Sequence, residues 1–164
     1  MVSGLRPWWP LLTLLASGAM LATAILYFQG MQGLQPCALC LKQREWHWGV
    51  VAVSALALVV TRARPAWSRW AIVIVGLVLL GSVAMASYHV AVEQKWVVAQ
   101  CDVGGAINAA DLSLNNLRDE LHPPRCDEIA WSLFGVSMAG YNAIVSLLLA
   151  LASFYVALAG KRDQ

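Results

Sequence analysis

Charged side chains are scarce in this chain of 164 residues. Asp, Glu, Lys and Arg make up 12% of the chain, while 60% of it is hydrophobic. A soluble domain is about a quarter charged and about half apolar, so the composition excludes a surface that mostly faces water. The formal net charge is only +2, which implies no nucleic-acid partner. At this length a single domain over residues 1–164 is expected.

Charge is missing altogether from several long stretches. No charged residue lies between Arg6 and Lys42, and residues 129–160 are uncharged throughout. Because about 20 apolar residues cross a bilayer, these runs predict membrane-spanning helices. Many Trp residues lie beside the ends of these runs, as is typical of the membrane–water interface. The four expected spans are residues 8–28, 41–60, 70–92 and 140–159. We therefore expect an all-α integral membrane protein, a four-helix transmembrane bundle in a lipid bilayer.

The first apolar run has an alternative interpretation as a cleaved signal peptide. Ala22-Thr23-Ala24 resembles a small-residue cleavage site. The apolar run continues through residues 25–28, however, and is longer than a usual signal core. A membrane span is the favoured interpretation.

Four spans place both termini on one side of the membrane, together with the link at residues 61–69. That link holds three Arg in nine residues, whereas residues 93–128 hold three basic residues in 36. The positive-inside rule therefore predicts cytoplasmic termini. The loops at residues 29–40 and 93–139 would then lie on the opposite side.

The second of these loops is the longest polar segment. Leu114, Leu117 and Leu121 fall on one helical face, which predicts a short surface helix over residues 111–121, with an irregular loop as the alternative. Residues 131–139 are expected to lie at the membrane interface.

Cysteine is also scarce. The predicted topology puts all of them outside the cytoplasm, in the oxidising compartment where disulfides persist. The four cysteines are Cys37, Cys40, Cys101 and Cys126. Three pairings are possible. The most local pair is Cys37 with Cys40, which leaves Cys101 with Cys126, but the resting connectivity stays open.

Several cysteine chemistries are excluded or disfavoured by what is missing. Cys101 and Cys126 form no tight knuckle, so a Cys₄ zinc site is not expected and no metal is predicted. Leu41 follows the second cysteine where covalent haem attachment needs His. A thioredoxin-type site needs a βαβ setting, and Cys37 and Cys40 lie between two spans instead.

The stretch from Pro36 to Arg44 predicts a reactive redox pair at the membrane surface. Two thiols separated by two residues can close a disulfide or open to a thiol and a thiolate. A helix that begins near Cys40 would place Cys40 and Arg44 on one face. The helix N-terminus and the Arg cation would then both favour a thiolate at Cys40.

Taken together, these motifs resemble the disulfide bond formation protein B (DsbB) family, over the whole chain. The matching motifs are Pro36-Cys-Ala-Leu-Cys-Leu-x-x-Arg44, Cys101-Asp102, Cys126 and Trp131-Ser-Leu-Phe-Gly-Val-Ser-Met138. Ala139 departs from the pattern, since some members have Pro there. This departure does not touch the redox residues.

The resemblance implies a quinone-dependent thiol oxidase of the bacterial inner membrane, with its cysteines on the periplasmic side. The implied partner is a periplasmic thioredoxin-fold dithiol oxidase of the DsbA type, which would attack Cys101 and free Cys126. Cys126 would then attack Cys37 and leave Cys40 as a thiolate. That thiolate would donate electrons to a quinone of the membrane pool, with ubiquinone expected ahead of menaquinone.

The resemblance also implies two quinone-binding residues besides Cys40. Arg44 would stabilise the negative charge that develops on the quinone. His89 matches a family His near the quinone, although a His that merely caps the third span is an equal alternative. Glu93 and Lys95 are expected to be solvated interface residues.

Two competing functions remain open at this point. One is a four-span structural or assembly protein with two inert extracytoplasmic disulfides, which would resist mild reductant. The other is a reductase that runs in the opposite direction, because the potential of the cofactor, and not Arg44, decides the direction.

Overall fold

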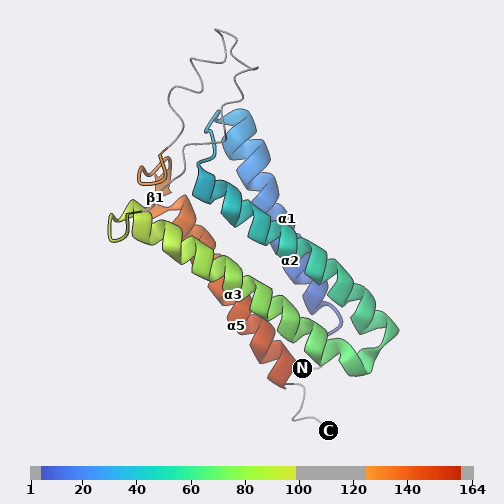
Figure 1. Cartoon of the computed structure of the whole chain (residues 1–164). Coiled ribbons are helices and arrows are strands. Elements are labelled where there is room, and N and C mark those ends of the chain that lie inside the picture. The colour runs from blue at the N-terminus through green and yellow to red at the C-terminus, as the bar shows by residue number, and fades with distance from the viewer. Residues whose placement is uncertain (1–4, 99–124, 160–164) are drawn as a thin grey trace, which may run out of the picture.

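Four long helices dominate the computed structural model, which describes residues 5–98 and 125–159 (Figure 1). The elements in chain order are α1 (Trp9–Ala22), the π-helix η2 (Thr23–Met31), α2 (Ala38–Ala63), the 3₁₀ turn η3 (Pro65–Trp67), α3 (Ser68–Glu93), strands β1 (Ser132–Leu133) and β2 (Val136–Ser137), and α5 (Met138–Ala159). Four helical segments of the described chain are long and apolar enough to cross a membrane, with η2 extending α1 and η3 preceding α3. The predicted all-α four-helix membrane bundle is therefore confirmed.

The boundaries of the helices differ from the prediction by a few residues. Helix α2 begins at Ala38 instead of 41, because Cys37 caps it. The expected nine-residue link at 61–69 is only a tight turn, since Arg64 has an extended φ of −139°. Pro65 accounts for this break, because the residue before a proline is disfavoured in the α conformation.

The segment before α5 forms a small β-hairpin, which the sequence analysis placed only at the membrane interface. Strands β1 and β2 are antiparallel, with Leu133 opposite Val136. The two turn residues, Phe134 and Gly135, both have positive φ, at 50° and 79°, as the favoured two-residue hairpin turns require. The surface helix predicted at residues 111–121 lies outside the described residues.

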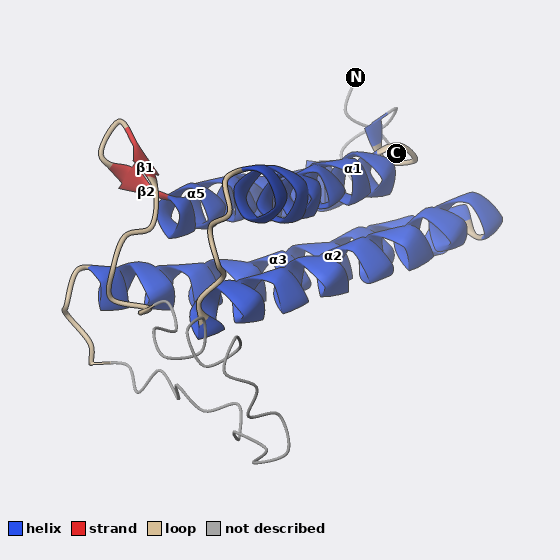
Figure 2. Ribbon diagram, turned by 90° about the horizontal axis from the view of Figure 1, so that it is seen from above, coloured by secondary structure: helices blue, strands red, loops and turns tan. Residues whose placement is uncertain are grey.

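The helices form two layers, with α1 and α5 in one and α2 and α3 in the other (Figure 2). At one end of the bundle, Arg6 donates hydrogen bonds to the carbonyls of Val156 (3.3 Å) and Ala157 (2.7 Å). Since these are the last carbonyls of α5, the start of α1 and the end of α5 lie together. The short turns between α1, α2 and α3 give an up-and-down arrangement.

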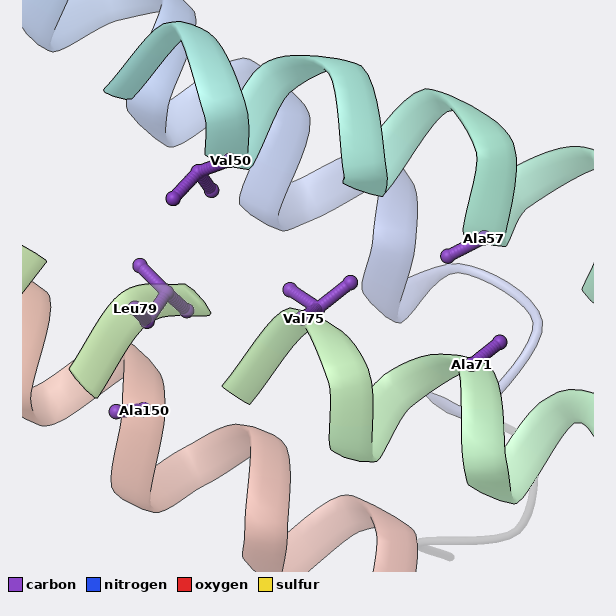
Figure 3. Packing of buried hydrophobic residues seen from close by; sticks show 6 residues of the cluster. All are labelled: Val50, Ala57, Ala71, Val75, Leu79 and Ala150. Carbon is purple, nitrogen blue, oxygen red and sulfur yellow. The ribbon is translucent and has the colours of Figure 1, made fainter. Parts of the chain in front are cut away.

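Small residues let the helices approach closely. One buried cluster joins α2, α3 and α5 (Figure 3), and its members are Val50, Ala57, Ala71, Val75, Leu79 and Ala150. Gly81 of α3 lies under the indole ring of Trp46 of α2, where even a methyl group would collide with the ring. Without a hydrophobic driving force in lipid, such close packing is what holds spanning helices together.

Large apolar side chains cover the outside of the bundle. Leu56, Leu77 and Leu148 are each more than half exposed, whereas Thr13, Ser54 and Ser146 are fully buried. This distribution is the reverse of that in a soluble bundle and fits a surface that faces lipid.

Candidate redox site

Cys37 forms the N-cap of α2. Its backbone is extended (φ −73°, ψ 168°), and its sulfur accepts a hydrogen bond from the backbone N–H of Cys40 at 3.2 Å. The cap satisfies one of the N–H groups that a helix start leaves without a partner. The helix therefore begins near Cys40, as predicted, with Cys40 and Arg44 four residues apart in its first turns; its cap is Cys37.

Hydrogen bonds make Cys37 the acidic thiol of the pair. Its sulfur accepts from the Cys40 thiol, from His89 and from the Cys40 backbone, and these donors lower the pKa of Cys37 from 9.0 to about 4, although burial raises it. A thiolate that accepts several hydrogen bonds at a helix N-terminus is stabilised in this way. These hydrogen bonds, the one from the Cys40 thiol above all, favour a thiolate at Cys37, whereas the sequence pattern predicted one at Cys40.

His89 of α3 faces the same sulfur. Its Nε2 lies 3.7 Å from the Cys37 sulfur and 3.9 Å from a carboxylate oxygen of Glu93. The prediction that Glu93 is solvated is wrong, since its side chain is only 5% exposed and accepts a hydrogen bond from Ser137 of β2. Lys95 is exposed as expected. The hairpin thus fixes Glu93 beside His89.

Both thiols line a cavity of about 530 Å³ between the helices and the hairpin. Its walls are mostly apolar and include the aromatic rings of Phe28, Trp131 and Tyr141, of which Phe28 and Trp131 are in edge contact at 5.1 Å. The polar residues on the walls include Cys37, Cys40, Gln43, Arg44, His47, His89, Glu93 and Asn142. The cavity has the size and the composition of a small-molecule site.

Arg44 reaches the cavity wall from α2 and is held in place by the π-helix. Its guanidinium donates to the side-chain oxygen of Gln29 at 2.7 Å and to the carbonyl of Ala24 at 3.1 Å. π-helical turns are rare and occur frequently at functional sites. Here the π-helix anchors the cation that the sequence analysis proposed as a quinone contact.

Three polar residues of the cavity were missed from the sequence. Gln43 contacts His89, Asn142 contacts Gln43, and His47 contacts Asn142. His47 is 4% exposed and lies buried in the bundle. The sequence signal that could have indicated this cluster was Asn142, because a polar residue inside an apolar span is usually functional.

Cys126 packs against the first cysteine pair. It is buried in one cluster with Cys37 and Val92, and Leu39 and Cys40 border that cluster. Cys126 is disulfide-bonded, whereas Cys37 and Cys40 carry free thiols. Cys101 lies outside the described residues. Three of the four predicted redox cysteines therefore lie in or beside one buried cluster.

The sulfurs of Cys37 and Cys40 and a ring nitrogen of His89 lie within 4.8 Å of one another. In the described part of the chain, these are the side chains that could hold a metal ion. The same atoms are those that a thiol–disulfide reaction would use. The expectation that no metal is bound stays a prediction.

The fold and the site together define a multi-pass membrane protein with a pair of free thiols on a cavity wall. The chain belongs to the DsbB family, because the model of the family described as Disulfide bond formation protein DsbB matches residues 6–156. A curated relative, Disulfide bond formation protein B 2 of Pseudomonas savastanoi pv. phaseolicola (strain 1448A / Race 6), is 28% identical over 149 residues, which cover 86% of this chain and 82% of the relative. No solved structure matches the chain. Family membership identifies it as a disulfide bond formation membrane protein.

The acidity of Cys37 can be tested by alkylation. In the reduced protein, the rate of iodoacetamide modification at Cys37, followed by peptide mass spectrometry, should stay high from neutral pH down to about pH 5 and fall as the pH passes through the pKa of about 4. The His89→Ala variant should move this midpoint upward by about one pH unit, because a donor to the thiolate is lost. A midpoint near that of a free thiol, about 8.5, would contradict the assignment.

The burial of Cys126 and Cys37 in one cluster predicts that a disulfide can form between them. In a Cys40→Ser, Cys101→Ser double variant, a mild oxidant should join Cys37 to Cys126 in most molecules, because the two lie in one buried cluster. A gel shift after maleimide labelling measures the product. The matched control adds Cys126→Ser, which should leave Cys37 open to labelling. Two thiols that both remain open to labelling in the double variant would show that they do not meet.

Proposed function

We propose that this protein oxidises the dithiol of a periplasmic thioredoxin-fold dithiol oxidase of the DsbA type and passes the electrons to a membrane quinone. One observation carries the proposal above all. The free thiols of Cys37 and Cys40 line an apolar cavity within the membrane-spanning bundle, beside the cation of Arg44. A dithiol held there can react with a lipid-soluble acceptor that enters from the bilayer.

The distribution of charge supports a location in the bacterial inner membrane with the cysteines on the periplasmic side. Arg62 lies 5.6 Å from the ring of Trp8, and Arg6 binds the end of α5. These basic residues lie at the end of the bundle opposite Cys37, which begins α2. Basic residues concentrate on the cytoplasmic side of membrane proteins, so the cysteines would face the periplasm.

The proposed exchange runs from the partner to the first cysteine pair in two steps. A thiolate of the partner attacks the sulfur of Cys101, a mixed disulfide forms, and Cys126 leaves as a thiolate. Cys126 then attacks Cys37, and Cys40 leaves as a thiolate. The burial of Cys126 against Cys37 supports the second step, since disulfide exchange needs contact between the attacking and attacked sulfurs.

The low pKa of Cys37 suits a return step. The second thiol of the partner attacks the mixed disulfide, so that the partner leaves with its own disulfide and Cys101 leaves as a thiolate. Cys101 then attacks Cys126, which re-forms their disulfide and releases Cys37 as a thiolate. A thiol of low pKa leaves faster in such an exchange, and the donors around the Cys37 sulfur stabilise the thiolate as it leaves. Cys37 and Cys40 can then close their disulfide again, with their two electrons and two protons passing to the quinone.

The cavity fits a quinone head group in size and chemistry. Its volume of about 530 Å³ falls within the usual range for small-molecule sites, roughly 300–1,000 Å³. A quinone accepts two electrons and two protons to become a quinol, which balances the two thiols oxidised to a disulfide. Cys40 would face the ring, Arg44 would supply a cation to its oxygens, and His89 would lie beside it on the cavity wall. Ubiquinone is the expected quinone, ahead of menaquinone.

The competing function, a structural protein with inert disulfides, accounts poorly for the first cysteine pair. An inert disulfide needs no acidic thiol and no cavity beside it. Here Cys37 has a strongly lowered pKa and both thiols reach the cavity wall. Perturbed thiols in a cavity are typical of reactive sites.

The Arg44→Ala variant tests the quinone site. With a reduced thioredoxin-fold dithiol as donor, kcat/KM for quinone should fall roughly tenfold to a hundredfold, because a charge-assisted contact to the reduced ring is lost. The KM for the dithiol donor should stay unchanged. Lys42→Ala is the matched control, since Lys42 lies on the same helix but is exposed in an ion pair with Glu45. Equal turnover of Arg44→Ala and parent at limiting quinone would reject this role for Arg44.

A further inference from the structure

A continuous chain of hydrogen bonds between buried side chains crosses the helix bundle and ends at the Cys37 sulfur. It crosses between helices α2, α5, α2 and α3 in turn. Its contacts, from the far end, are His47 Nε2 to Asn142 Oδ1 (2.7 Å), Asn142 Nδ2 to Gln43 Oε1 (2.5 Å), Gln43 Nε2 to His89 Nδ1 (2.5 Å) and His89 Nε2 to Cys37 Sγ (3.7 Å). His47, Asn142, Gln43, His89 and Cys37 are all buried.

Every bond in this chain is donated in the same direction. An amide nitrogen can only donate and an amide oxygen can only accept. The amide of Gln43 therefore donates to Nδ1 of His89, which places the proton of the neutral His89 ring on Nε2. Reversing the amide of Gln43 or Asn142 alone would bring two donors or two acceptors together, and a buried unpaired polar group is costly.

We propose that Gln43 and Asn142 are positioning residues, which hold His89 in the tautomer that donates its Nε2 proton to the Cys37 sulfur. The hydrogen bond that Ser146 donates to Asn142 Oδ1 at 3.0 Å fixes the amide of Asn142 further. His47 begins the chain as a donor to the same oxygen. The inference rests on the proposed function for its role in turnover, because Cys37 must leave and attack as a thiolate there.

His89 matters because few other donors reach the Cys37 sulfur. The titratable and charged groups around Cys37 are Cys40 and Arg44 of α2, His89 and Glu93 of α3, and Arg125, Cys126 and Glu128 of the segment before the hairpin. Glu93 lies 3.9 Å from His89 Nε2 and competes for the same proton. If Nδ1 of His89 carried the proton instead, Nε2 would present a lone pair to both the Cys37 thiolate and the Glu93 carboxylate.

The test interrupts the hydrogen-bond chain and leaves Cys37 and His89 unchanged. The variants are Asn142→Leu and Gln43→Met, each close in size to the residue it replaces. In the reduced protein, both should raise the pH midpoint of Cys37 alkylation by about one unit, which lowers the thiolate fraction roughly tenfold below the midpoint. Both should also shift the ring ¹⁵N resonances of His89, measured by NMR, away from the pattern of the Nε2–H tautomer.

The matched control is Ser54→Ala. Ser54 makes a buried hydrogen bond of 2.9 Å with Thr13 between α1 and α2, outside the chain, so its loss should change neither readout. Unchanged alkylation midpoints and unchanged His89 resonances in both Asn142→Leu and Gln43→Met would overturn the inference. Neither readout needs quinone or partner. A protein that shows both shifts but reduces no quinone would therefore reject the proposed function and keep the inference.

Discussion

The hydrogen bonds that converge on the Cys37 sulfur are the interaction on which the rest of the site depends. The sulfur caps α2 through the Cys40 N–H at 3.2 Å and accepts from His89 of α3. Because the capping atom is the thiol sulfur itself, the hydrogen bond that caps the helix also contributes to the acidity of Cys37. Helix α2 then carries Cys40, Gln43 and Arg44 onto the cavity wall.

The apolar surroundings explain why most polar side chains around the cavity are paired, although Nδ1 of His47 has no partner among the described residues. In a bilayer no water can satisfy a buried polar group, so a partner inside the protein is strongly favoured. The residues Gln43, Asn142 and His89 solve this together in one chain, and Ser137 of the hairpin pairs with Glu93. Cys37, Cys40 and the cavity are therefore set in a rigid polar frame, while the outside of the bundle stays apolar.

The sequence alone was enough to predict the four spans, the family and the importance of the stretch from Pro36 to Arg44. Hydropathy alone predicts the four helices, since length and apolarity decide whether a segment can cross a bilayer. It could not predict that Cys37 caps α2, because capping depends on where the helix starts to within one residue. It also gave no sign that Glu93 is buried, since Ser137 of the hairpin, which donates a hydrogen bond to it, lies far along the chain.

The measurement that tests the central claim most directly is quinone reduction by the purified protein in detergent, beside the Cys40→Ser variant. The donor is a reduced thioredoxin-fold periplasmic dithiol, and the loss of quinone absorbance is followed with time. The account predicts that the parent consumes one quinone for each dithiol oxidised and that Cys40→Ser consumes none. No consumption by the parent with either ubiquinone or menaquinone, with its disulfides intact after the donor is added, would contradict it.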